Sequence, residues 1–349
     1  MHVVHINFSI TVGGIDTMLI DILNEQVKSV KTTLIIINDL VEKTVLANLN
    51  SKVQVVNINR KEGSKNILKI LKFNFLIFKL KPSIIHCHNS GIVNLLIFKK
   101  CPVVLTVHDV KYSTKSYYKY SKIFAISDAV KKDIEKSGKF PVLTVYNGIN
   151  GELIAKKENV EANEVFKLVI VSRLEHYKKG HDLLFLAIKE LKDKYYITLD
   201  VIGDGSSLSY LTELSKELEI QKQVRFLGMK TRDYIYENLK NYDLLIQPSR
   251  YEGFGLTIVE AMFAKVLVLT SDIDGPVEIL NHGEYGFCFK SDDVKDLILK
   301  LDYILSNYES IFHEFTYNAY TRVKNNFSIQ NTAENYINYC SELIKNEVK

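Results

Sequence analysis

The fold class can be read from residues 168–205, LVIVSRLEHYKKGHDLLFLAIKELKDKYYITLDVIGDG. An apolar run at Leu168–Ser172 is typical of a buried strand, and a second such run follows at Ile197–Ile202. Between the two runs, His181–Lys192 repeats apolar residues at helical spacing. Two buried strands joined by a helix form a βαβ unit, in which the strands lie parallel in one sheet.

The same alternation of apolar runs and amphipathic segments extends along the rest of the chain. Further helices are expected at Ile15–Ser29, Ala129–Ser137, Leu208–Leu218 and Asn331–Lys349. Further strands are expected at Val3–Asn7, Thr33–Asn38, Val53–Ile58, Ile84–Cys87, Val103–Val107, Ile123–Ile126, Val142–Val145, Val224–Leu227, Leu244–Pro248 and Val266–Thr270. We therefore predict an α/β fold with parallel sheets covered by helices on both faces.

The pattern is interrupted between Asn147 and Lys167, where an Asn-Gly-Ile-Asn-Gly turn precedes the polar residues 155–164. A chain of 349 residues suits two domains. We predict a first Rossmann-like domain over residues 1–155, a second over 166–325, and a C-terminal helix over 326–349 that returns to the first. Two such domains in tandem imply a cleft between them, with ligands beyond the carboxyl ends of the strands.

Composition excludes several classes of protein. A content of 46% hydrophobic and 25% charged residues is ordinary for a soluble globular chain. The most apolar stretch, residues 66–80, is interrupted by three lysines and falls short of the ~18 residues that suggest a membrane span. The sequence after Met1 has no basic segment or cleavage site typical of export. The four cysteines lack zinc or disulfide spacing, so we expect a cytoplasmic protein.

Charge is distributed unevenly between the two halves. Residues 1–150 contain 21 Lys and Arg against 10 Asp and Glu, whereas residues 151–349 contain 24 against 31. A basic first half suggests an anionic partner such as a membrane surface or phosphates. A solvated lysine face is the alternative. No nucleic-acid motif accompanies these lysines, and we expect no nucleic-acid partner.

The most informative segment for chemistry is residues 248–262, PSRYEGFGLTIVEAM. A strand ends, Gly253 and Gly255 allow a tight loop, and a helix begins near Leu256. The helix start presents free N–H groups and the positive end of the dipole, which favours phosphate. Glu252 lies before the helix and Glu260 within it. Carboxylates accept pairs of hydrogen bonds, which suits neighbouring hydroxyls of a sugar.

This segment resembles the E-x7-E signature of glycosyltransferase family 4, a group of retaining enzymes with the GT-B fold. The resemblance covers nearly the whole chain. It extends to residues 171–182, which look like the family's phosphate loop, and to the glycine turn at residues 201–205. Further matches are residues 13–14, 105–109, 125–128, 146–148, 226–228 and, with altered residues, 274–278. Several linked motifs in the right order make the resemblance specific, and GT-B becomes the expected architecture.

The resemblance implies a role for each matching residue around the donor. Arg173 and a nearby lysine are expected to clamp the donor diphosphate and to neutralise charge on the leaving group. Lys179, directly before Gly180, is the favoured lysine and Lys178 the alternative. A solvated basic loop is the other interpretation. Glu252 is expected to act in catalysis beside the donor sugar. The other implied donor-binding residues are Gly14, Gly203, Phe254, Gly255, Leu256, Thr257 and Glu260.

Histidines end two strands of the first half. His108 follows the run Leu105–Val107, and in the family such a histidine lies beside the donor sugar, so we predict a catalytic role. His86 and His88 flank Cys87 and are expected on the acceptor side. A purely structural role is the alternative for all three histidines. We expect neither a metal nor any other cofactor, because GT-B enzymes use basic residues and a helix dipole to stabilise the diphosphate.

The resulting functional hypothesis is a retaining hexosyltransferase that uses a nucleotide sugar, most plainly a UDP-sugar. Asp109 and Glu252 are the carboxylates near the motifs, and neither is an obvious nucleophile for double displacement. We therefore expect attack by the acceptor on the same face that the diphosphate leaves. The alternatives are a GT-B epimerase or hydrolase of nucleotide sugars and a nucleotide-sugar-binding subunit that needs a partner.

The acceptor is expected to be a glycan linked to a lipid, in the synthesis of a surface polysaccharide. Residues 65–81 combine five lysines with Ile, Leu and Phe, and residues 111–122 combine four lysines with four tyrosines. Basic and aromatic residues together suit an anionic bilayer surface. We therefore expect a peripheral location at the inner face of the plasma membrane. A basic surface helix and a mobile loop are the alternative.

Overall fold

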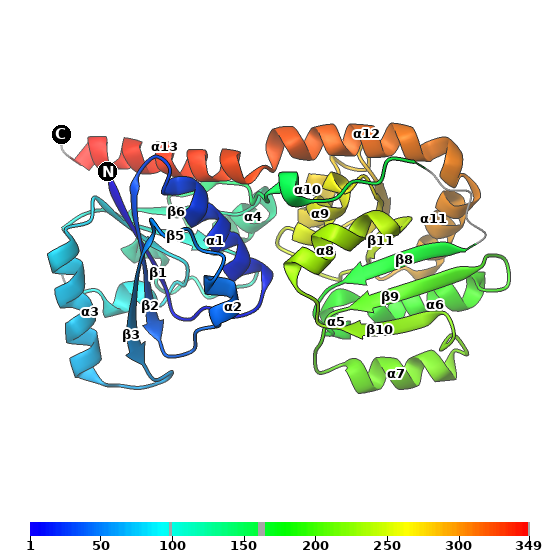
Figure 1. Cartoon of the computed structure of the whole chain (residues 1–349), viewed down its shortest axis with the longest axis horizontal. Coiled ribbons are helices and arrows are strands. Elements are labelled where there is room, and N and C mark those ends of the chain that lie inside the picture. Colours follow the sequence, from blue (N-terminus) through cyan, green and yellow to red (C-terminus); the bar gives the residue numbers. More distant parts are fainter. Residues whose placement is uncertain (98–99, 160–164, 348–349) are drawn as a thin grey trace. The chain divides into compact units, whose positions relative to one another are not determined.

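Two parallel β-sheets organise the computed structural model, which describes residues 1–97, 100–159 and 165–347 (Figure 1). The chain divides into two compact units. Unit 1 comprises Met1–Ile149 and Ser328–Lys349, and unit 2 comprises Asn150–Phe327. Residues 160–164 of the predicted linker, and the last two residues of the predicted terminal helix, lie outside the described residues.

Unit 1 contains a seven-stranded sheet in the order β3-β2-β1-β4-β5-β6-β7. Its strands are β1 (His2–Asn7), β2 (Lys31–Asn38), β3 (Gln54–Arg60), β4 (Ile84–Cys87), β5 (Val103–Val107), β6 (Lys122–Ala125) and β7 (Val142–Thr144). All neighbouring strands pair in parallel. Every residue of β1, β4 and β5 is buried, which explains why these strands are mostly apolar; their buried polar residues include His5 in β1 and His86 in β4.

The helices of unit 1 are α1 (Gly14–Gln26), α2 (Lys43–Leu46), α3 (Ile67–Leu80), α4 (Asp128–Lys136) and α13 (Ile329–Glu347). The last of these comes from the far end of the chain and packs against α1. Ile329 N donates to Ile149 O at 3.0 Å, and Thr332 Oγ1 donates to Tyr146 O at 2.8 Å. The fully buried ring of Tyr336 then completes the core, so residues 328–347 are an integral part of unit 1.

Unit 2 contains a six-stranded parallel sheet in the order β10-β9-β8-β11-β12-β13. Its strands are β8 (Phe166–Val171), β9 (Ile197–Ile202), β10 (Val224–Gly228), β11 (Leu244–Gln247), β12 (Leu267–Ser271) and β13 (Phe287–Phe289). Its helices are α5 (His176–Lys179), α6 (His181–Leu191), α7 (Leu208–Glu217), α8 (Arg232–Asn238), α9 (Leu256–Phe263), α10 (Asp274–Ile279), α11 (Val294–Ser306) and α12 (Tyr308–Asn326).

Both sheets have their first strand in the middle, with the next two strands on one side and the later strands on the other. In this doubly wound order the chain reverses direction across the sheet between β1 and β4 in unit 1 and between β8 and β11 in unit 2. Loops diverge at such a point and leave a crevice at the carboxyl ends of the strands, where open α/β sheets bind their ligands. The predicted site residues are therefore expected at these carboxyl ends.

The predicted strands are confirmed to within two residues at each end. The strand β13 and the helices α2, α5, α8 and α10–α12 were not predicted from the sequence. Half of the tyrosines expected on the surface of residues 111–122 are instead in the core. Tyr117 is 1% exposed, and Tyr120 is 4% exposed and donates to Ser90 O at 2.9 Å. Within the described part of the chain, no helix combines the length and apolar character that crossing a bilayer requires.

Candidate active site

Two loops meet at the switch point of unit 2. The first follows β8 and runs through α5 to Gly180, and the second follows β11 and runs from Pro248 to Gly255. The two loops are joined by a backbone hydrogen bond from Arg250 N to Lys178 O at 2.8 Å. The phosphate loop and the signature segment of the sequence analysis are therefore one structural feature.

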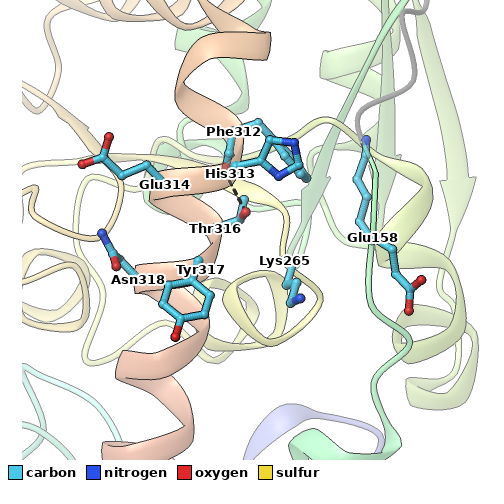
Figure 2. A pocket seen from close by; sticks show the side chains of 9 residues that line it. Glu158, Lys265, Phe312, His313, Glu314, Thr316, Tyr317 and Asn318 are labelled. Atoms are coloured by element: carbon cyan, nitrogen blue, oxygen red, sulfur yellow. Dashed lines mark hydrogen bonds between the residues drawn. The ribbon is translucent and has the colours of Figure 1, made fainter.

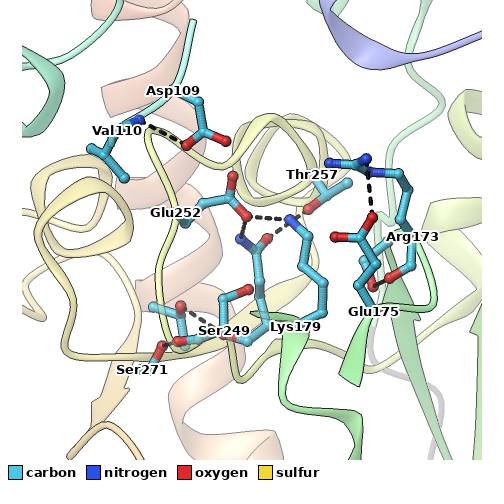
Figure 3. Close-up of polar contacts among 12 residues, drawn as sticks. Asp109, Val110, Arg173, Glu175, Lys179, Ser249, Glu252, Thr257 and Ser271 are labelled. Carbon is cyan, nitrogen blue, oxygen red and sulfur yellow. Dashed lines mark hydrogen bonds and ion pairs between the residues drawn. The ribbon is translucent and has the colours of Figure 1, made fainter. Parts of the chain in front are cut away.

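Lys179 and Glu252 form an ion pair between these loops, and their side chains point toward one another in Figure 3. Both side chains are largely buried, at 13% and 15% exposure. Gln247, the last residue of β11, holds this pair in place. Its Nε2 donates to Glu252 Oε2 at 3.4 Å, while its Oε1 accepts from Thr257 Oγ1 at 2.7 Å. The result is a cation and an anion held side by side at the carboxyl ends of neighbouring strands.

Gly180 makes the close approach of the two loops feasible. Its φ of 68° lies in the left-handed region, and a Cβ at this position would lie 1.9 Å from Pro248 O. No side chain fits there. Glycine therefore ends α5 at the point where Lys179 can reach Glu252.

Lys178 and Lys179, the two candidates for the diphosphate-binding lysine, have different surroundings. Lys178 is 7% exposed, and its Nζ lies 4.9 Å from the ring centre of Tyr251. Such a cation–π contact holds the ammonium group on the aromatic face. Lys179 instead extends to the carboxylate of Glu252. The geometry thus brings Lys179 to Glu252, the first acidic residue of the signature.

Arg173 follows β8 directly and lies in the same loop as α5. Its side chain is 69% exposed and pairs with Glu175 at 3.1 Å (Figure 3). An exposed pair of this kind contributes little to stability. The guanidinium group is therefore free to exchange Glu175 for an anionic ligand at small cost.

The glycine turn after β9 supports the phosphate loop from the other side. Gly203 has a φ of 139°, and a Cβ here would lie 1.9 Å from Ser172 O. Leu174 N donates to Asp204 O at 2.9 Å, and Ser207 N donates to Leu174 O at 2.9 Å. Because Gly203 has no side chain, the turn after β9 can pack directly against residues 172–174 of the loop after β8.

Helix α9 begins directly after the signature loop. Gly255 has a φ of 119° and provides no side-chain cap, so the helix starts with its first N–H groups uncapped by a side chain. The ring of Phe254 is buried and packs edge-on against Phe327, with 5.5 Å between ring centres. Leu256, Thr257 and Glu260 are half-buried. Any ligand contact of Phe254 must therefore use its backbone.

Arg250 is a central residue of this loop that sequence reasoning missed. Its guanidinium group donates to both carboxylate oxygens of Asp182, at 3.0 and 2.7 Å, and to Asp292 at 2.7 Å. It also donates to His176 O at 2.9 Å. These partners, with the hydrogen bonds to Asp182 first, raise the pKa of Arg250. Arg250 ties the signature loop to α5 and α6, and its distant partners leave no local signal in the sequence.

The predicted residues of unit 1 lie at the carboxyl ends of β1, β4 and β5. Gly14 opens α1 and is exposed, and the loop before it is held by Asp16, which accepts from Thr11 N at 2.8 Å. His86 is fully buried in β4, with its Nε2 2.7 Å from Thr106 Oγ1. His88 and His108 are 4% and 7% exposed, and His88 Nδ1 lies 3.3 Å from His108 Nε2.

His5 joins these histidines and was not among the predicted residues. Its Nδ1 lies 3.0 Å from His88 Nε2, and its Nε2 lies 2.7 Å from Gln26 Oε1. Burial lowers the pKa of His5 and of His108 to about 4 and lowers that of His86 and His88 well below the usual value. The parallel pairing of β1 with β4 places His5 opposite His86, a signal that required the strand order.

His5, His86 and His88 place ring nitrogens within 4.8 Å of one another. Their ring planes are inclined to one another by only 16–35°. A metal lies in the plane of each imidazole that binds it, so rings this close to parallel do not direct their lone pairs to one point. The hydrogen bonds already described also occupy one nitrogen of His86 and two of His5. The arrangement is better described as a hydrogen-bonded array than as a metal centre.

A hollow of about 470 Å³ elsewhere in unit 2 lies beside α12 (Figure 2). Glu158, Lys265, His313 and Glu314 are among its lining residues, so its charges are mixed. Lys157 also lines it, but its Nζ is buried in a 2.5 Å ion pair with Asp243. This hollow has no set of like charges that would select a phosphate, and it is distinct from the switch-point loops.

Comparison with known proteins agrees with this geometry. A family model described as "Glycosyltransferase Family 4" matches residues 12–153, and a model described as "Glycosyl transferases group 1" matches residues 152–322. Together they cover residues 12–322 without a gap. The chain belongs to glycosyltransferase family 4, and it is a glycosyltransferase of the GT-B fold.

Two curated relatives are about a quarter identical to this chain in sequence. The capsular polysaccharide biosynthesis glycosyltransferase CapM of Staphylococcus aureus is 25% identical over 76% of this chain and 78% of its own. The 2-deoxystreptamine N-acetyl-D-glucosaminyltransferase of Niallia circulans is 26% identical over 74% and 75%. Among solved structures, Anabaena Alr3699/HepE in complex with UDP-glucose has a TM-score of 0.83 at 20% identity, over 98% of this chain and 100% of that one. At this identity the structural likeness shows the fold alone.

Proposed function

We propose that this chain transfers a hexose or N-acetylhexosamine from a UDP-sugar to a hydroxyl of a glycan acceptor, with retention of anomeric configuration. The observation that carries the proposal is the Lys179–Glu252 pair at the switch point of unit 2. The names of similar proteins support the substrate classes. One is a capsular polysaccharide biosynthesis enzyme, and another was crystallised with UDP-glucose.

The donor diphosphate would bind between the phosphate loop and the start of α9. Lys179 and the exposed guanidinium of Arg173 offer two positive charges from one loop, and the uncapped end of α9 offers N–H groups from the other. Glu260, one helical turn further along α9, is assigned to the ribose hydroxyls. In this arrangement, protein cations take the role that a divalent metal has in other glycosyltransferases.

Glu252 is assigned to hydroxyls of the donor sugar. In the free protein it is paired with Lys179. When the diphosphate arrives, its phosphate oxygens compete for Lys179 and release one carboxylate oxygen to accept from the sugar. The pair therefore keeps two buried charges balanced until the substrate replaces the contact between them.

The proposed reaction occurs on one face of the sugar. The bond between the anomeric carbon and the β-phosphate oxygen breaks, and the acceptor oxygen forms the new bond on the same face. The acceptor proton passes to an oxygen of the leaving diphosphate. Arg173 and Lys179 stabilise the negative charge that develops on this leaving group, which is commonly the largest contribution to such catalysis. No covalent glycosyl-enzyme forms on Glu252 or Asp109.

A lipid-linked acceptor is proposed from the surface of α3. At about 100° per residue, Ile67, Leu68, Leu71, Phe75 and Phe78 share one side of this helix. All five are at least 50% exposed, whereas Phe73 and Ile77 on another side are buried. Lys72 and Lys79 are exposed and border the apolar side. An exposed apolar strip bordered by lysines suits the interface of an anionic bilayer. The exposed apolar strip supports the proposal that the protein works at the inner face of the plasma membrane.

The direct test is a screen of UDP-, GDP-, ADP- and dTDP-sugars for release of the nucleoside diphosphate, with and without a crude lipid extract. We expect release from one UDP-sugar, stimulated by lipid and lost in both Glu260→Ala and His108→Ala proteins. Release of UDP with an epimerised or free sugar, unaffected by lipid, would replace the proposal with an epimerase or hydrolase. Donor binding without turnover under every condition would indicate a subunit that needs a partner.

A further inference from the structure

Four side chains of unit 1 form one continuous line of hydrogen bonds. Gln26 Oε1 lies 2.7 Å from His5 Nε2, His5 Nδ1 lies 3.0 Å from His88 Nε2, and His88 Nδ1 lies 3.3 Å from His108 Nε2. Each of the four residues is at most 7% exposed. The line begins at a side-chain amide of α1 and ends at His108.

The fold places these residues on three neighbouring strands and one covering helix. β1, β4 and β5 are adjacent, and each carries or precedes a histidine at its carboxyl end. Neighbouring rings are nearly parallel, with 16° between the planes of His5 and His88 and 28° between those of His88 and His108. The corresponding ring centres are 5.4 and 5.5 Å apart, the separation expected when each hydrogen bond lies close to both ring planes. His86 lies over this line, 4.6 Å from the ring centre of His88.

A line of neutral imidazoles has a direction. A neutral histidine has one N–H and one lone pair, so each ring can donate through only one nitrogen. The carbonyl oxygen of Gln26 only accepts, and His5 must therefore hold its proton on Nε2. His5 Nδ1 is then an acceptor, which requires the proton of His88 on Nε2. His88 Nδ1 is then an acceptor in turn, and its hydrogen bond requires the proton of His108 on Nε2.

This direction leaves His108 Nδ1 as a lone pair at the end of the line. Among the described residues that nitrogen is buried and has no hydrogen-bond partner. A buried acceptor without a donor is costly, so it is suited to receive a donor from a bound molecule. Hydroxyl groups can donate to it, whereas carboxylate and phosphate oxygens cannot.

We propose that Gln26, His5 and His88 are positioning residues that hold His108 as the Nε2–H tautomer, so that its Nδ1 accepts a hydrogen bond from a hydroxyl group of the bound substrate. The identity of the ligand as a sugar rests on the proposed function, whereas the tautomer does not. The amide at residue 26 thereby selects the kind of group that His108 recognises three side chains away.

The test is long-range nitrogen NMR of the unliganded protein labelled with 15N-histidine, at pH 7.5. Peaks are assigned by their loss in His5→Gln, His88→Gln and His108→Gln proteins. We expect all three residues to show Nε2–H with Nδ1 unprotonated. An Nδ1–H signal from any of them in the wild-type protein would overturn the proposal, whatever the variants do.

Gln26→Met then removes the acceptor while keeping the length of the side chain. We expect a mixture of tautomers at His108 and a rise of about tenfold in KM for the donor, the equivalent of one hydrogen bond. The matched control is His2→Gln, since His2 also lies on β1 and bonds a side chain, Thr33 Oγ1 at 2.9 Å, outside the line. We expect neither change in this control. An unaltered tautomer at His108 in Gln26→Met would contradict the proposal.

The two readouts keep the inference separate from the proposed function. Absence of turnover with every nucleotide sugar would reject the function and leave the NMR result to decide the tautomer. Turnover with the opposite tautomer would reject the inference and leave the function in place.

Discussion

Gly180 and Gly228 have the same backbone angle, a φ of 68°, yet their surroundings differ. A Cβ at Gly180 would lie 1.9 Å from Pro248 O, whereas a Cβ at Gly228 meets nothing within 4 Å. The comparison therefore separates the cost of the left-handed angle from the cost of steric overlap. It also tests the claim that Gly180 holds together the two loops of the candidate site.

We expect Gly228→Ala to lower the free energy of unfolding by about 1–2 kcal/mol, the cost of the left-handed angle alone. Gly180→Ala should lower it by about 1–3 kcal/mol more, because atoms must move apart in a packed region. Urea unfolding followed by circular dichroism measures both. Equal losses in the two variants would show that the loops move apart without cost at Gly180.

Gly180 also explains why the sequence alone could not decide between Lys178 and Lys179 as the lysine of the candidate site. Lys178 and Lys179 are neighbours in a single helical turn, so their directions differ by about 100°. Which lysine reaches Glu252 depends on how Gly180, at the end of α5, packs against Pro248. Pro248 lies 68 positions further along the chain. The motif therefore predicts a lysine here, while the choice between them needs the fold.

At the scale of elements, the buried histidines at the carboxyl ends of β1, β4 and β5 predict that the stability of the protein depends on pH. Burial lowers the pKa of His5 and of His108 to about 4, from a usual value of 6.5. Between about pH 6.5 and 4, the unfolded chain binds protons that the folded chain does not. Stability therefore rises with pH in this window, is fully present above pH 6.5, and is lost as the pH falls toward 4.

Urea unfolding at several pH values between 7.5 and 5 checks this effect. Wild-type protein should lose about 1.4 kcal/mol per pH unit for each such histidine. In His5→Gln the free energy of unfolding should change less steeply with pH, by the equivalent of about one proton, even if the stability at pH 7.5 is lower. Identical slopes for the two proteins would mean that His5 titrates normally in the folded state.

Helix α3 predicts binding to anionic vesicles. Phe75 and Phe78 are 68% and 59% exposed, and burying aromatic side chains in a bilayer interface is favourable. We expect Phe75→Ser combined with Phe78→Ser to weaken sedimentation with phosphatidylglycerol vesicles by tenfold or more. The matched control is Leu299→Ser combined with Tyr317→Ser, which removes side chains of 67% and 65% exposure from unit 2. Similar binding by both variants would remove α3 from the proposed membrane surface.

At the scale of the whole molecule, the alternation of strands and helices predicted two parallel-sheet domains, because buried parallel strands are apolar throughout. The motifs pointed to the two loops that meet at the switch point of unit 2, and phosphate binding by the first of them stays a prediction. Helix α12 was missed because its many polar residues weaken the apolar pattern. Helix α11 was missed although its apolar residues, among them Leu297, Leu301 and Ile304, recur at helical spacing. Arg250 and Gln247 were also missed, because their roles arise from contacts with Asp182 and Glu252 that only folding creates.

The division into units makes a further prediction about the C-terminal segment. Removing residues 328–349 would delete Ile329, Ala333, Tyr336 and Cys340, each at most 3% exposed in the whole chain, and would leave the core of unit 1 that they pack against uncovered. We expect this truncation to abolish the cooperative thermal unfolding of unit 1. A chain that ends at Glu342 keeps those residues and serves as the control. Unfolding like that of the full chain in the protein that ends at Phe327 would show that unit 1 does not depend on α13.

The central claim is that the switch point of unit 2 holds the donor diphosphate through Lys179. The most direct measurement is kcat/KM for the donor in Lys179→Met, compared with Lys189→Met, which changes an exposed lysine on α6. We predict a loss of about 10²–10³ for Lys179→Met, the range for removing one donor to a developing negative charge, and no loss for Lys189→Met. Equal activity in the two variants would contradict the account.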